Sequence, residues 1–261
     1  ETELKCLAKL WPSMSLRGAE PKPVDTNICL VFDCSSSMLR KGKLAAAIES
    51  AKLIVDMIPE SQRISLVAFQ SSIHMLVDNA QATTAEKDNI KEQIEQIRSL
   101  AGGSTNMTDG IKEGARSCKR SRAEAKVMII LSDGAADFPK AAEKAARVAT
   151  DEGVQLFAVG IGDQYKADHL LKLVTPSNGT LFGESEVEKI KSTFSTLISR
   201  IENFVATNAR IEICFDEEVQ AGLAFKTSPE QAFIGNMQPD GDRLVRFNVG
   251  NIERDKEYSF L

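Results

Sequence analysis

Residues 27–37 read NICLVFDCSSS, in which five apolar residues lead directly into an aspartate and a cluster of serines. A continuous apolar run of this length is typical of a strand that is buried on both faces, as in a parallel sheet. Residues 43–57 then place apolar side chains on one helical stripe, and Pro59 ends the pattern. A buried strand that is followed by an amphipathic helix predicts an α/β fold.

The same alternation of short apolar runs and amphipathic segments continues to residue 204. It predicts strands at 63–69, 72–77, 127–131, 155–161 and 181–182, and helices at 86–97, 108–122, 139–151 and 187–204. Only Gln70 and Ser71 separate the first two of these strands, which favours an antiparallel hairpin at the sheet edge. We therefore expect residues 27–205 to form a doubly wound, mostly parallel, Rossmann-like sheet.

Beyond residue 206 the apolar residues alternate with polar ones, which is the period of a half-buried strand. The alternation occurs at 211–215, 219–225 and 245–249, and again near the start of the chain at 4–10. Residues 1–26 and 206–261 are therefore expected to form one small all-β sandwich. The chain ends inside a strand pattern, so we expect this sandwich to be C-terminally incomplete.

The 261 residues carry a formal net charge of -5, and the pI is near 5.3. Nucleic acids are bound largely through lysine and arginine, so no nucleic-acid partner is expected. No apolar run approaches the roughly 20 residues of a membrane-spanning helix, so no membrane contact is expected of this segment.

The five cysteines lie far apart and include no CxxC pair: Cys6, Cys29, Cys34, Cys118 and Cys214. Reduced, buried thiols are the simplest interpretation, and they favour a cytoplasmic location. An extracellular or membrane-anchored location of a longer protein is the alternative.

Polar side chains with oxygen atoms follow two of the predicted central strands and fill one glycine-rich loop. The candidate metal ligands are Asp33, Ser35, Ser37, Thr105 and Asp133. The carboxyl ends of parallel strands meet at one edge of a sheet, where ligands bind, and Gly134 permits the tight turn after Asp133. A set of oxygen ligands selects Mg²⁺, with Mn²⁺ or Ca²⁺ as alternatives. If the hydroxyls bind directly and the aspartates act through water, the ion keeps much of its charge and attracts an outside carboxylate.

Three motifs together resemble the metal-ion-dependent adhesion site of von Willebrand factor A domains. They are the Asp-x-Ser-x-Ser pattern that begins at Asp33, Thr105 in its loop, and Ser-Asp-Gly at 132–134, in the order of the family. The resemblance covers about residues 27–204. Cys34 and the flanking strands are most similar to bacterial members that carry a β-sandwich built from both termini.

This resemblance implies a metal-dependent protein-binding module and no enzymatic activity. Asp33, Ser35 and Ser37 would anchor the ion, Thr105 would engage it in the ligand-competent state, and an Asp or Glu of a partner protein would complete its coordination.

Two other functions are considered. A metal-independent structural scaffold in a larger complex would bind through the sandwich or a helix face. A magnesium-dependent phosphate-processing enzyme is disfavoured, because Ser35 stands where such phosphatases need a second acid and residues 102–105 lack the lysine of a nucleotide-binding loop. The histidines, His74 and His169, are expected on the surface.

Overall fold

The computed structural model describes residues 8–10, 24–184, 195–196, 198–201, 203–214, 222–228, 232–236, 244–254 and 256–261. The chain divides into two compact units, of which the larger is Val24–Glu202. The smaller unit is made of the two end segments, Glu1–Pro23 and Asn203–Leu261.

The described part of the larger unit forms one six-stranded sheet in the order β4-β3-β2-β5-β6-β7. Its strands are β2 (Thr26–Asp33), β3 (Arg63–Phe69), β4 (Ile73–Gln81), β5 (Ala125–Ser132), β6 (Val154–Ile161) and β7 (Leu181–Glu184). All neighbours are parallel except β3 and β4, which form the antiparallel edge hairpin that the sequence predicts. Strand order reverses between β2 and β5, so the sheet is doubly wound and these two strands flank its switch point.

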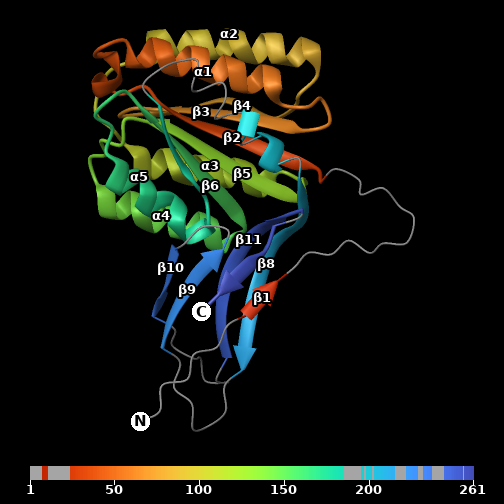
Figure 1. Ribbon diagram of the computed structural model, residues 1–261. Helices are drawn as coiled ribbons and strands as arrows, with labels where there is room; N and C mark the ends of the chain where they lie inside the picture. Colours follow the sequence, from red (N-terminus) through yellow and green to blue (C-terminus); the bar gives the residue numbers. More distant parts are fainter. Residues whose placement is uncertain are drawn as a thin grey trace. The chain divides into compact units, whose positions relative to one another are not determined.

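Helices cover both faces of this sheet (Figure 1). They are α1 (Lys43–Met57), α2 (Thr84–Leu100), α3 (Met107–Arg120), α4 (Pro139–Asp151) and α5 (Ala167–Val174). α1 and α2 lie on one face, and α3, α4 and α5 lie on the other. Apolar side chains of α3, α4 and α5 form one buried cluster with the sheet side chains of that face.

Two glycines let α3 lie unusually close to the sheet. A Cβ added at Gly110 would lie 2.8 Å from the Phe69 ring, and one added at Gly114 would lie 2.8 Å from a methyl group of Val31. The close approach holds the start of α3, and with it the preceding Thr105 loop, against β2 and β3. Glycine is therefore required here for packing rather than for backbone freedom.

The Gly114→Ala variant should lose about 1–3 kcal/mol of unfolding free energy, the usual cost of an extra group in a packed core. The better helix propensity of alanine offsets up to about 1 kcal/mol of this. Urea unfolding measures the difference. Arg116→Ala on the exposed side of the same helix is the control and should change stability by less than about 0.5 kcal/mol. Equal effects of the two substitutions would refute the packing role of Gly114.

The smaller unit contains two antiparallel sheets. One has the order β1-β12-β9-β10 and the other pairs β11 with β8. These strands are β1 (Ala8–Leu10), β8 (Phe204–Cys214), β9 (Leu223–Ser228), β10 (Ala232–Asn236), β11 (Leu244–Glu253) and β12 (Tyr258–Phe260). Side chains of β11 and β12 share one buried cluster, against which β8 packs. The N-terminal β1 pairs with the C-terminal β12, so the expected all-β fold from both chain ends is confirmed.

Several predicted elements differ from the observed ones. The sequence did not predict α5, an eight-residue helix, although Leu170, Leu173 and Val174 bury one side of it. The predicted helix 187–204 lies partly outside the described residues, and Phe204 belongs to β8 instead of to that helix. The predicted N-terminal strand positions Leu4 and Cys6 also lie outside the described residues.

Candidate metal site

The first site residue, Asp33, is the last residue of β2 and is fully buried. The backbone N–H of Ser35 donates to Asp33 Oδ1 at 2.9 Å, and the Ser132 hydroxyl donates to Asp33 Oδ2 at 2.5 Å. Ser132 in turn accepts a hydrogen bond from the N–H of Gly134 at 2.9 Å. The carboxylate is therefore held in place by both strands at the switch point.

Ser35 and Ser37 turn toward each other after this strand. Their Oγ atoms lie 3.1 Å apart, and Ser35 is buried while Ser37 is half-buried. Ser37 belongs to the short helix Ser36–Leu39, whose Met38 is buried, and Ser35 is the residue that precedes this helix. Two hydroxyl oxygens at this separation can share one small cation.

The loop that carries Thr105 is tied to the loop after β2 by backbone hydrogen bonds. The N–H of Ser36 donates to the Gly103 carbonyl at 3.1 Å, and the N–H of Gly102 donates to the Cys34 carbonyl at 2.8 Å. The N–H of Thr105 donates to a carboxylate oxygen of Asp137 at 3.1 Å. Thr105 thus lies between the loops that follow β2 and β5.

Asp133 begins the loop after β5, where Gly134 adopts φ 78° and turns the chain. Its Oδ1 accepts a hydrogen bond from the N–H of Ala135 at 3.2 Å. Its Oδ2 lies 2.8 Å from Nζ of Lys43, the first residue of α1. All five predicted ligands therefore lie in three segments at the carboxyl ends of the central strands: the end of β2 with the turn after it, the Thr105 loop, and the start of the loop after β5.

The two aspartates differ in their electrostatic surroundings. Burial raises the pKa of Asp33 to about 6, although hydrogen bonds from Ser132 and Ser35 lower it, and the charge of Asp133 adds to the increase. Asp133 pairs with Lys43, whereas no lysine or arginine among the described residues forms an ion pair with Asp33. Within the part of the chain that the structure describes, Asp33 is therefore a buried carboxylate without a compensating lysine or arginine.

The chemistry of these side chains fits a hard divalent cation. The donor set is entirely oxygen, and the described residues contain no cluster of three or more histidine, cysteine or acidic residues that would favour another kind of metal site. Ser35, Ser37 and Thr105 would offer hydroxyl oxygens, and the two carboxylates would supply negative charge. Such a cation would offset the desolvation of Asp33.

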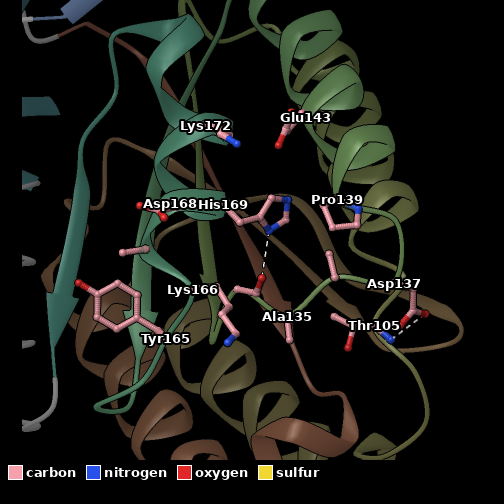
Figure 2. A pocket seen from close by; sticks show the side chains of 13 residues that line it. Thr105, Ala135, Asp137, Pro139, Glu143, Tyr165, Lys166, Asp168, His169 and Lys172 are labelled. Atoms are coloured by element: carbon pink, nitrogen blue, oxygen red, sulfur yellow. Dashed lines mark hydrogen bonds between the residues drawn. The ribbon is translucent and has the colours of Figure 1, made fainter.

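A cavity of about 790 Å³ opens beside Thr105, between the loop after β5 and the start of α5 (Figure 2). His169 projects into it and places Nδ1 3.0 Å from the Gly134 carbonyl oxygen. Lys166 and Lys172 line the cavity from the α5 side. The charged residues that line the cavity favour a polar ligand that itself carries charge.

The prediction that both histidines lie on the surface was wrong. His74 and His169 are half-buried, and the Nε2 atom of each is buried without a hydrogen-bond partner among the described residues. The ring of His169 points inward, where its Nδ1 contacts the carbonyl oxygen of Gly134 in the turn after β5. A single histidine in a sequence carries no signal for such a contact.

The described cysteines are free: Cys29, Cys34, Cys118 and Cys214. Three of them are buried as expected, but Cys214 is exposed because it ends β8 on the outer side of its sheet, and Cys6 lies outside the described residues. Burial, with the neighbouring charge of Asp33, raises the pKa of the Cys34 thiol to about 12. Cys34 is therefore an inert thiol that donates to the Phe69 carbonyl at 3.3 Å.

Two residues that shape the site were not predicted from the sequence. Ser132 orients Asp33, and its place before Asp133 in the Ser-Asp-Gly motif was the available signal. Lys43 pairs with Asp133 across 90 positions of the sequence, and only the folded chain reveals that contact.

Residues 27–202 match the family model of the von Willebrand factor type A domain. An uncharacterized protein of Synechocystis sp. is 25% identical over 245 residues, which cover 85% of this chain and 56% of that protein. The chain therefore spans little more than half the length of this relative.

Solved structures share the fold. A von Willebrand factor type A protein of Catenulispora acidiphila matches with a TM-score of 0.79 at 18% identity, covering 91% of this chain and 57% of that one. A pilus adhesin of Lactobacillus rhamnosus GG matches with a TM-score of 0.59 at 13% identity, covering 91% and 39%. Within the described residues, no helix has the length and apolar character that crossing a membrane requires.

Proposed function

Because the chain belongs to the von Willebrand factor type A family, we propose that it is a protein-binding module that holds a partner's Asp or Glu carboxylate through a divalent cation. The cation is Mg²⁺, with Mn²⁺ or Ca²⁺ as substitutes. Ser35, Ser37 and Thr105 bind it directly. Asp33 and Asp133 hold it mainly through water.

One observation carries this assignment of roles. Both oxygens of Asp33 and both oxygens of Asp133 already accept hydrogen bonds from the protein. Carboxylates held in this way supply charge and hydrogen bonds to water without enclosing the ion. The hydroxyls neutralise none of its charge, so the ion remains a strong attractor for an outside carboxylate.

The cavity beside Thr105 supplies room for the side chains next to that carboxylate. It begins at Thr105 and Asp137 and continues toward Lys172 and Glu143 (Figure 2). The lining carries both charges, with Lys166, Lys172 and Asp168 on the α5 side and Asp137 and Glu143 on the α4 side, and this favours a partner segment with polar residues of both charges. The module would act as part of a larger protein. Its location would be the cytoplasm or, by likeness to a pilus adhesin, a cell-surface assembly.

Affinity capture tests the proposal. The wild-type chain and the Asp33→Asn variant are immobilised and exposed to an extract of the source cells with Mg²⁺ or with EDTA. We expect at least one protein to be retained about tenfold or more above both the EDTA and the variant samples, a difference of about 1.4 kcal/mol in binding free energy. Asp109→Asn, an equivalent change at a half-buried aspartate of α3 that pairs with Lys112, is the matched control and should capture normally.

Capture that is equal in Mg²⁺, in EDTA and with Asp33→Asn would overturn metal-dependent binding and favour the scaffold function. Capture of nothing specific under any condition would also count against the module. Turnover of a phosphate ester that depends on Asp33 would replace it with the enzymatic alternative.

A further inference from the structure

Lys43 places its ammonium group inside the proposed metal site. Nζ lies 2.8 Å from Asp133 Oδ2, and only 17% of the Lys43 side chain and 5% of the Asp133 side chain are exposed. This pair differs from helix-surface ion pairs such as Arg98–Glu95, Lys112–Asp109 and Lys119–Glu152, in which both side chains are at least 39% exposed. An ion pair with this little exposure is only weakly screened by water and salt.

The chain makes room for this lysine. Gly162, just after β6, has φ 86°, and a Cβ at that position would lie 3.0 Å from Cε and 3.2 Å from Cγ of Lys43. The aliphatic part of Lys43 therefore passes over a glycine on its way to Asp133. A larger residue at position 162 would crowd the path by which Lys43 reaches the carboxylate.

We propose that Lys43 is a built-in cation that sets the charge of the metal site. This inference rests on the proposed function. The two aspartates bring two negative charges, and Lys43 offsets one of them. With a divalent ion bound, the site then has a net charge of +1, whereas without Lys43 it would be neutral. The site therefore holds its metal less tightly, and an anionic partner is needed to make it neutral.

Metal affinity tests this role directly. Mn²⁺ binding is measured by calorimetry at pH 7.5 for the wild type, for Lys43→Met and for Lys119→Gln. Lys43→Met keeps the aliphatic stem and removes the charge. Lys119→Gln makes the same change of net charge at an exposed position on α3. We expect Lys43→Met to bind Mn²⁺ about tenfold more tightly than the wild type, from the removal of one charge at contact range, and Lys119→Gln to bind within about twofold of the wild type.

A second readout covers the case in which Lys43→Met folds poorly. Without metal the variant leaves Asp133 buried and unpaired, so its melting temperature should fall in EDTA, and Mn²⁺ should raise it by more than it raises the wild type. Equal or weaker Mn²⁺ binding by Lys43→Met, with an equal or smaller thermal shift, would overturn the role of Lys43 while the metal site itself stands. Failure of the wild type and the variant alike to bind Mn²⁺ would overturn the proposed function as well.

Discussion

The Asp33→Asn variant should be more stable than the wild type in EDTA at pH 7.5, by up to roughly 3 kcal/mol. Burial raises the pKa of Asp33 in the folded chain to about 6 from an ordinary value of 3.8. A raised pKa means that the folded state favours the protonated acid. The stabilisation that the protonated Asp33 contributes is fully present below about pH 4 and is lost as the pH rises through 6. Asparagine does not titrate and avoids this loss.

Urea unfolding in EDTA at pH 4.5, 6 and 7.5 measures the effect. Other titrating groups change equally in both proteins, so the difference between variant and wild type isolates Asp33. Asparagine weakens the hydrogen bonds from Ser35 and Ser132 by about 1 kcal/mol, but this cost is the same at every pH. A stability difference that stays constant from pH 4.5 to 7.5 would refute the raised pKa of Asp33.

Asp133→Asn should have the opposite effect and destabilise the protein in EDTA by about 3 kcal/mol, the low end of the range for breaking a buried ion pair. The variant leaves the ammonium of Lys43, whose side chain is only 17% exposed, without the carboxylate that it contacts at 2.8 Å. Chemical unfolding at pH 7.5 measures this loss. Two aspartates of one site are thus expected to change stability in opposite directions, because among the described residues Asp133 has a cationic partner and Asp33 does not.

The double variant Asp133→Asn with Lys43→Met separates this ion pair from other effects. If the pair accounts for the loss, the double variant should be clearly more stable than the sum of the two single changes implies. Additive effects of the two substitutions, or a gain in stability from Asp133→Asn alone, would show that the pair contributes nothing to the fold.

The sheet of the larger unit was predictable because its central strands are buried on both faces. The apolar runs at 28–32, 127–131 and 155–161 identify β2, β5 and β6 without any knowledge of their neighbours. The edge strand β4 runs to Gln81, four residues beyond its predicted end, since most of its residues are half-buried and carry no continuous apolar pattern. α5 was missed because eight residues give barely two helical turns of periodicity.

The candidate site also contains a part that the sequence predicts and a part that it does not. Asp33, Ser35, Ser37, Thr105 and Asp133 are local to strand ends, so a topology argument from the sequence brings them to one edge. Lys43 and His169 enter through contacts between segments far apart in the chain, and the burial of Asp33 depends on the packing of several elements. Those features depend on packing between distant segments, so they follow only from the folded structure.

Calorimetric titration of Mg²⁺ at pH 7.5 tests the central claim most directly. The wild type and the Asp109→Asn control should bind a single ion with the same affinity. Asp33→Asn should bind it more than about 100-fold more weakly, since even residues that only support metal ligands are worth about 10- to 100-fold. Mg²⁺ binding that is unaffected by Asp33→Asn, or no saturable binding to the wild type, would contradict a metal site at the carboxyl ends of β2 and β5.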